Sequence, residues 1–224
     1  PAKWYDLWTM EDFILRLAIG LPGFLLAIVF HEVSHAYVAS RFGDNTAMVS
    51  GRMTLNPASH IDPLGTFVLP LIGAAFGGVM FGWAKPVPVD SRRFTEYRKG
   101  MFWVSFAGPL ANLLLAVISA VAFAIVVTQI SREFYFYEIF SQMLHQAILI
   151  NIVLGMFNLI PFPPLDGSKM VSSFLNFEQA RKYEELQQFS LIFILLIWTT
   201  PILHYVIGPV MSLGNNLVNI LVFM

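Results

Sequence analysis

Cysteine is absent from this sequence, which excludes disulfide bonds and thiolate metal sites. Any metal would therefore need His, Asp or Glu side chains as its ligands. Charged residues are also scarce, at 12% of the chain against about 25% in soluble domains, and the net charge of −1 provides no basic surface for nucleic acid. Hydrophobic residues make up 57% of the 224 residues. This composition predicts an integral protein of the lipid bilayer.

Four apolar segments have the length that a membrane-spanning helix needs. They run from about Phe13 to Phe42, Met101 to Thr128, Phe140 to Phe162, and Phe189 to Val210. We therefore expect an all-α polytopic membrane protein with about four to six transmembrane helices. The sequence shows no internal repeat. A single membrane-embedded domain is predicted over residues 1–224, with a core at about 13–167 and C-terminal helices at 186–224.

Other segments are predicted to enter the membrane only in part or to pair as strands. Leu64–Phe81 is short and interrupted by proline and glycine, which favours a re-entrant element over a crossing helix. The tail Met211–Met224 forms either a last short span or an interfacial helix. Ala47–Leu55 and Lys85–Val89 are predicted to form a short β-hairpin or sheet, whose second strand is confined to an edge by its prolines. The alternative for both segments is a plain connecting hairpin.

The charges of the loops predict an orientation in the cell membrane. Lysine and arginine are concentrated in Gly82–Gly100, whereas Ser131–Gln142 and the N-terminal arm carry more acidic residues than basic ones. The positive-inside rule places the first stretch in the cytoplasm and the other two outside. Pro163–Gly167 then reaches the cytoplasmic side only if Leu64–Phe81 does not cross the membrane.

The most informative motif is His31-Glu32-Val33-Ser34-His35, because it lies inside the first apolar span. On a helix, the two imidazoles lie one turn apart on one face, a spacing that a single Zn²⁺ bridges, and the adjacent Glu can serve as a general base. Ionisable side chains are costly in hydrocarbon, so their presence indicates a functional site. The alternative, a chance motif with structural histidines, leaves three polar side chains on adjacent turns unexplained.

A catalytic zinc usually has three protein ligands and one open position. Asp166 is the best candidate for the third ligand, because the stretch Asn158–Gly167 contains three prolines that end a helix at membrane depth. Unwound backbone at that depth needs a polar or protein-buried surrounding, which a metal site provides. The alternative is that Asp166 is an ordinary turn residue before glycine.

The order of these motifs resembles the site-2 protease family of intramembrane zinc metalloproteases. The resemblance covers about Phe30–Gly167 and includes Ala107-Gly108-Pro109-Leu110-Ala111-Asn112 between the other two motifs. The chain is similar to the compact bacterial and archaeal type, which has no PDZ or CBS domain. The resemblance implies a substrate that is a transmembrane helix of another protein, and the loop charges above place the active site toward the cytoplasmic side of the cell membrane. The oligomeric state stays open.

The same resemblance implies a role for each site residue. His31, His35 and Asp166 would ligate one zinc ion per chain. Glu32 would be the general base, and Asn158 would engage the backbone of the substrate. The two strands predicted above would offer an edge to which an unwound substrate could add.

Two functions outside proteolysis also fit part of the pattern. A membrane metal-ion transporter would carry His and Asp within its spans, but here the polar residues cluster at one site. A silent binding scaffold would not need Glu32, because structural zinc requires no base. His60 is predicted to be a structural loop residue, with an auxiliary ligand as the alternative, and His145 and His204 are predicted to be structural. Asn112 is predicted to bond across helices.

Overall fold

A computed structural model describes residues 9–75 and 82–199, together with residues 205, 208, 209, 212, 216, 219 and 220. Every regular element in this part of the chain is helical. Within these described ranges, three helices are long and apolar enough to cross a membrane: α1 (Met10–Arg41), α4 (Tyr97–Gln129) and α5 (Tyr137–Asn158). The shortest has 22 residues and is about 33 Å long at 1.5 Å per residue, enough for the hydrocarbon core.

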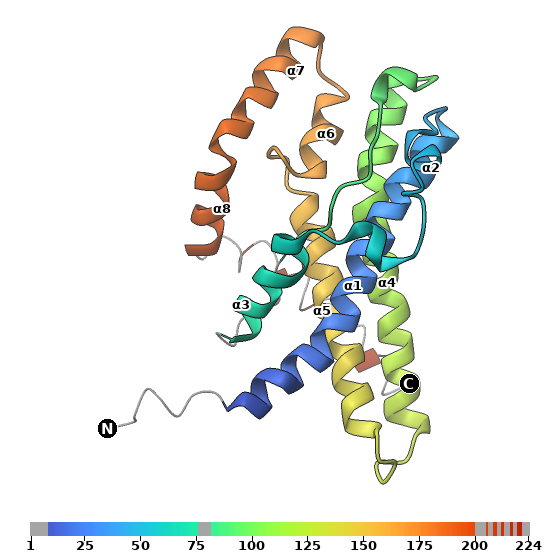
Figure 1. Ribbon diagram of the computed structural model, residues 1–224, viewed down its shortest axis with the longest axis vertical. Helices are drawn as coiled ribbons and strands as arrows, with labels where there is room; N and C mark the ends of the chain where they lie inside the picture. The colour runs from blue at the N-terminus through green and yellow to red at the C-terminus, as the bar shows by residue number, and fades with distance from the viewer. Residues whose placement is uncertain are drawn as a thin grey trace.

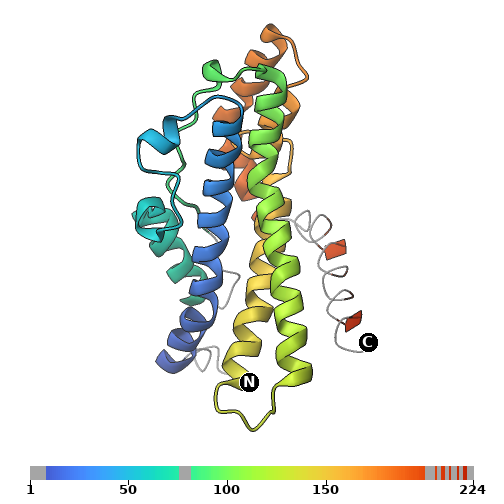
Figure 2. The ribbon, with the colours of Figure 1, turned by 90° about the vertical axis from the view of Figure 1, so that its right-hand side faces the viewer.

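The three long helices lie side by side and pack against one another, as Figures 1 and 2 show. α1 begins at a capping box, in which Thr9 and Asp12 exchange side-chain and backbone hydrogen bonds. α4 and α5 meet through the small residues Ala116 and Ala120 against Ile148 and Ile152. Small side chains allow membrane helices to approach closely, and close packing replaces the hydrophobic driving force that is missing in lipid.

The short elements gather near the end of the bundle where α1 stops and α4 starts. These are α2 (Thr46–Val49), η3 (Ser91–Arg93), α6 (Asp166–Ser172) and α7 (Phe177–Glu184), followed by η4 (Glu185–Phe189) and α8 (Ser190–Thr199), whereas η1 (Pro57–His60) lies nearer the middle of the bundle, beside α1. Figure 1 draws α2, α6 and α7 at the upper end, with α8 running back toward the middle. The bundle therefore carries its short helices mainly at one end, the end toward which His31 and His35 of α1 lie.

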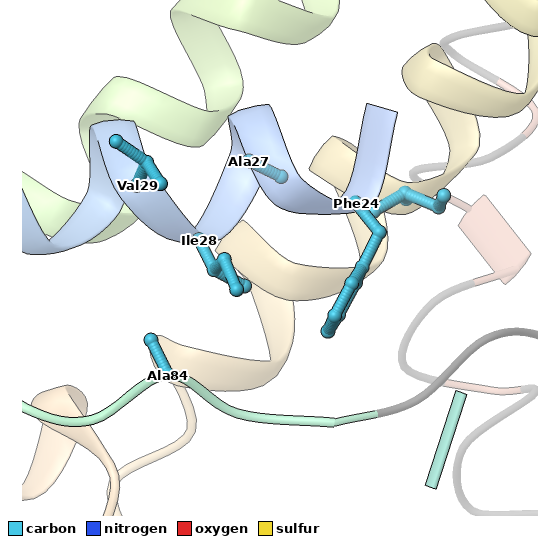
Figure 3. Close-up of a cluster of buried hydrophobic side chains, with 6 residues drawn as sticks. Phe24, Ala27, Ile28, Val29 and Ala84 are labelled. Atoms are coloured by element: carbon cyan, nitrogen blue, oxygen red, sulfur yellow. The ribbon is translucent and has the colours of Figure 1, made fainter. Parts of the chain in front are cut away.

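The core beside the site joins α1 to α5 and to the segment 82–90. Phe24, Ala27, Ile28 and Val29 of α1 form one buried cluster with Ile150 of α5 and Ala84 (Figure 3). This cluster lies directly before the His-Glu motif in the sequence of α1. It therefore fixes the position of that motif relative to α5 and to the loop segment.

The predicted β-hairpin or sheet is wrong: no residue that the structure describes lies in a strand. Ala47–Leu55 begins as helix α2, where the N–H of Thr46 donates to the Asp44 carboxylate, and continues as turns and bends. Lys85–Val89 lacks helical structure but forms no ladder. Its two prolines have no N–H to donate, and the N–H of Val87 is taken by a side chain, Glu32.

The described residues contain three helices able to cross a membrane, fewer than the four to six expected for the whole chain. Residues 63–75 form a π-helical turn, η2 (Pro63–Val68), and α3 (Leu69–Ala75). Together they are about 20 Å long, too short to cross. Re-entry of Leu64–Phe81 stays a prediction, since residues 76–81 lie outside the described residues. So do His204, part of the expected fourth span, Phe189–Val210, and most of the tail Met211–Met224.

Candidate metal centre and active site

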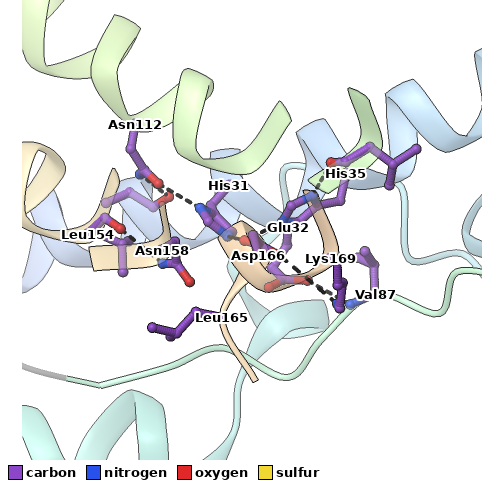
Figure 4. A network of polar contacts seen from close by, with 12 residues as sticks. His31, Glu32, His35, Val87, Asn112, Leu154, Asn158, Leu165, Asp166 and Lys169 are labelled. Atoms are coloured by element: carbon purple, nitrogen blue, oxygen red, sulfur yellow. Dashed lines mark hydrogen bonds and ion pairs between the residues drawn. The ribbon is translucent and has the colours of Figure 1, made fainter. Parts of the chain in front are cut away.

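The structure brings His31, His35 and Asp166 together from two distant parts of the chain. The histidines lie one turn apart on α1, and Asp166 is the first residue of α6. One carboxylate oxygen, Asp166 Oδ2, lies 3.1 Å from His31 Nε2 and 3.2 Å from His35 Nε2 (Figure 4). All three side chains are buried. Their ligand atoms lie within 4.8 Å of one another, so they could hold one metal ion.

Asp166 reaches the histidines because α5 ends before the proline-containing stretch and the chain then turns sharply. The helix ends at Asn158, before Pro161, Pro163 and Pro164. Gly167 makes the turn possible: a Cβ at this residue would lie 2.3 Å from the carbonyl oxygen of Leu159 and 2.6 Å from that of Ile160. Only glycine can follow Asp166 in this arrangement, so the Asp-Gly pair serves the close approach of two backbone segments.

The Nδ1 atoms of His31 and His35, which point away from the cluster, each face a hydrogen-bond acceptor. His31 Nδ1 lies 2.6 Å from Asn112 Oδ1, and His35 Nδ1 lies 2.6 Å from the Val104 carbonyl oxygen. Each Nδ1 therefore donates a proton, and in a neutral ring Nε2 carries a lone pair. Two such nitrogens and a carboxylate oxygen then converge with no proton between them. A cation satisfies this arrangement, so the donor set fits a divalent metal such as zinc.

Gly108 of α4 forms the floor of this cluster. A Cβ on Gly108 would lie 2.4 Å from His35 Nε2 and 2.7 Å from both Nε2 and Cε1 of His31. The bare backbone of α4 thus makes room for the inner edges of both imidazoles. Any side chain at this position would occupy the space into which the ligand atoms point.

Glu32 lies beside the cluster and is held by the segment 82–90. Its Oε2 accepts a hydrogen bond of 2.7 Å from the N–H of Val87. That segment is itself fixed: the Lys85 N–H donates to the His60 carbonyl oxygen at 2.9 Å, and Arg52 Nη2 donates to the carbonyl oxygen of Lys85 at 2.8 Å. The carboxylate next to the first histidine therefore has a defined orientation at the site.

Asp44 anchors the far end of the same segment. This buried carboxylate accepts a hydrogen bond of 2.7 Å from the N–H of Asp90. Burial alone would raise the pKa of Asp44, but hydrogen bonds from Thr46 and Asp90 outweigh it, so the pKa lies below its usual value. Asp44 therefore stays ionised at neutral pH and keeps the segment attached to the end of α1.

A cavity of about 470 Å³ opens onto the cluster. Its polar lining comes from His31, Glu32, His35, Ser105, Asn158, Asp166 and Lys169, and apolar residues such as Trp83, Val87, Leu154, Phe157 and Leu165 form much of the remainder. Asn158 donates its Nδ2–H to the Leu154 carbonyl oxygen at 2.9 Å. Lys169 Nζ lies 4.0 Å from Asp166 Oδ1. A small polar centre in an apolar cavity is the usual form of a ligand site.

Comparison with known proteins identifies the family. The family model of peptidase family M50 matches residues 125–198, which include Asn158 and Asp166. A Bacillus subtilis protein named "Putative zinc metalloprotease YwhC" is 36% identical over 217 residues, which cover 95% of this chain and 91% of the relative. "Putative zinc metalloprotease Rip2" of Mycobacterium tuberculosis is 32% identical over 184 residues, 82% of this chain and 68% of the relative. The chain belongs to peptidase family M50. No solved structure matches it.

Membership of family M50 confirms the resemblance to site-2 proteases. The M50 peptidase is a zinc metalloprotease of the membrane, and the part of the chain that the structure describes has three helices able to span it. The transporter and the scaffold considered from the sequence are therefore set aside. Zinc is the metal of this M50 peptidase. Among the residues that the structure describes, the side chains of His31, His35 and Asp166 form the group that could hold it.

The remaining histidines of the M50 peptidase lie away from the cluster where they are described. His60 is fully buried, and its Nε2–H donates to the Thr54 carbonyl oxygen at 2.7 Å. His145 contacts the ring of Phe123, with centroids 6.0 Å apart. Neither is among the residues that line the cavity. Both positions agree with the structural roles predicted for them.

Sequence reasoning missed several groups that shape the site. Asn112 bonds across helices as predicted, but it also contacts His31, and Asn151 supports it. Asn151 carried a signal that could have revealed it, since an amide inside an apolar span needs a partner. The backbone groups of Val87 and Val104 carried none, because every residue has the same N–H and C=O.

Proposed function

We propose that this M50 peptidase is an endopeptidase that cuts transmembrane segments of other membrane proteins. In this proposal His31, His35 and Asp166 hold one zinc ion, and Glu32 is the general base. The observation that carries the proposal is the convergence of three ligand atoms inside a membrane-spanning bundle, next to a carboxylate that does not belong to the ligand set. Hydrolysis of a peptide by a zinc-bound water needs ligands that hold the metal and a separate base that accepts the proton of the water.

The chemistry follows from these positions. Zinc bound there would act as a Lewis acid that polarises a carbonyl and lowers the pKa of water to about 7. Glu32 accepts the proton of the attacking water and returns it to the amide nitrogen as the C–N bond breaks. The Val87 N–H keeps the Glu32 carboxylate oriented throughout. Asn158, on the cavity wall, offers its amide to the substrate backbone.

The apolar cavity walls support a membrane segment as substrate. A transmembrane helix hides its carbonyl groups in its own hydrogen bonds, so it must unwind locally before attack. The apolar lining accommodates the side chains of such a segment, while the polar groups at the cluster receive its backbone. Soluble, charged peptides would lose solvation on entering this cavity and gain little in return.

Cleavage of a reconstituted transmembrane peptide tests the proposal. We expect the purified chain to contain one zinc per molecule and to cut an apolar helical peptide within its membrane segment. A hydrophilic peptide of equal length serves as the control and should be cut far more slowly. Cleavage confined to the hydrophilic peptide, or a chain whose zinc does not depend on His31, would contradict the proposal.

The proposed site faces the cytoplasm, and the absence of native cysteine makes this easy to test by labelling. Single cysteines at Ser59 and Ser91 are expected to react with a membrane-impermeant thiol reagent from the same, cytoplasmic side. A cysteine at Ser131, exposed in the loop between α4 and α5, should react only from outside. Labelling of Ser59 and Ser91 from opposite faces would show that the segment between them crosses the bilayer.

A further inference from the structure

The two histidines of the cluster are oriented by different kinds of acceptor. His35 donates its Nδ1–H to a backbone carbonyl, Val104 O, which can only accept. His31 donates its Nδ1–H to a side chain, Asn112 Oδ1. A primary amide can present either its oxygen or its NH₂ group to a neighbour. Something must therefore fix the orientation of the Asn112 amide before it can fix His31.

Two acceptors on neighbouring helices provide that orientation. Asn112 Nδ2 lies 3.0 Å from the Ala27 carbonyl oxygen and 3.0 Å from Asn151 Oδ1. Asn151 donates its own Nδ2–H to the Ala147 carbonyl oxygen at 2.9 Å, which turns its Oδ1 toward Asn112. Each amide is thus oriented by a backbone carbonyl that cannot change its role. The Oδ1 of Asn112 is the atom left to face His31.

These hydrogen bonds lie where the three long helices meet. Ala147 and Asn151 belong to α5, Asn112 to α4, and Ala27 and His31 to α1. Asn112 is 0% and Asn151 2% exposed, and neither lines the cavity. A flipped Asn112 amide would set its oxygen against two other oxygens, and its NH₂ against the Nδ1–H of His31. Away from water, such unmade hydrogen bonds are costly.

We propose that Asn112 and Asn151 are positioning residues, an amide relay from α5 through α4 to α1 that holds His31 in the tautomer whose Nε2 is free to bind zinc. Without the relay, a neutral His31 can place its proton on Nε2, where it would bond Asp166 and be lost as a ligand. The inference rests on the zinc site proposed above. The relay touches neither substrate nor metal and acts through the ring of His31.

Zinc affinity, measured by chelator competition on the full chain in detergent, separates this relay from simple helix packing. Asn112→Leu removes the acceptor and is expected to weaken zinc binding by about 10- to 100-fold. Asn112→Asp keeps an acceptor opposite Nδ1 and is expected to retain most of the zinc affinity, while the oxygen that replaces its NH₂ faces the Ala27 carbonyl oxygen and Asn151 Oδ1 and should lower the melting temperature. Ala120→Val, in the buried contact between α4 and α5, is the packing control and should lower the melting temperature without changing zinc affinity.

The outcomes distinguish the relay from the site on which it depends. Equal affinity in Asn112→Leu and the wild type, or equal loss in Asn112→Leu and Asn112→Asp, would overturn the relay. If Asn112→Leu does not fold, the pair Asn151→Leu and Asn151→Asp decides: only the first should weaken zinc binding and alter the absorption spectrum of the Co²⁺-substituted protein. Wild-type affinity in His31→Ala would instead overturn the zinc site itself.

Discussion

Glu32→Gln is expected to stop peptide cleavage while zinc stays bound. Loss of a general base lowers a rate by about 10²- to 10⁴-fold, and glutamine cannot accept the proton of the attacking water. The substitution is nearly isosteric, and the glutamine oxygen can still accept the hydrogen bond from the Val87 N–H. The measurement is kcat/KM on a reconstituted transmembrane peptide, together with the zinc content per chain.

Glu133→Gln is the matched control for the loss of one carboxylate. Glu133 is exposed in the loop between α4 and α5, at the opposite end of the bundle from α6. Its variant should cleave and bind zinc as the wild type does. Two results would contradict the assignment of Glu32: a Glu32→Gln variant that still cleaves, or one that loses its zinc and so places Glu32 among the ligands.

The helical part of the site could be predicted because helix geometry is regular. Any helix places residues i and i+4 on one face, so His31 and His35 had to lie together once the span was recognised. The membrane strengthened the prediction, because His, Glu and Asp side chains have few other reasons to lie there. Asp166 could be predicted from the three prolines before it, which indicate the end of a helix. In the structure α5 ends at Asn158, three residues before the first of these prolines, Pro161.

The β-hairpin could not be judged from the sequence, because a ladder depends on partners that sequence spacing does not reveal. Lys85–Val89 has the composition of an edge strand, yet its backbone groups bond to Glu32, His60 and Arg52. Length and hydropathy were sufficient for the three long spans, α1, α4 and α5, and the shortness of Pro63–Ala75 agrees with the expectation that this segment does not cross the membrane.

Gly108 also shows that contacts between distant parts of the chain cannot be read from the sequence. The sequence suggests close helix packing at Gly108-Pro109, since small residues commonly mediate it. The structure adds what packs there: the ligand atoms of two imidazoles, from a helix far away in the sequence. A close approach between distant segments leaves no periodic signal, so this role becomes visible only in three dimensions.

Gly108→Ala is therefore expected to cost most of the zinc affinity and with it the proteolytic activity. The new Cβ would lie 2.4 Å from His35 Nε2 and 2.7 Å from His31 Nε2. The rings cannot easily withdraw, because each Nδ1 is held by a hydrogen bond of 2.6 Å to Asn112 or Val104. Overpacking costs about 1–3 kcal/mol, which corresponds to a loss of zinc affinity of about 5- to 150-fold.

Gly155→Ala provides a control at the same helix contact. A Cβ on Gly155 would approach the Pro109 carbonyl oxygen to 3.2 Å, a tight contact that does not involve the imidazoles. This variant should lose some thermal stability and keep wild-type zinc affinity in the same chelator competition. Equal zinc affinity in Gly108→Ala and Gly155→Ala would contradict this prediction. It would mean that the imidazole rings of His31 and His35 can move away from the new Cβ, so that a rigid, preformed ligand set would not explain metal binding.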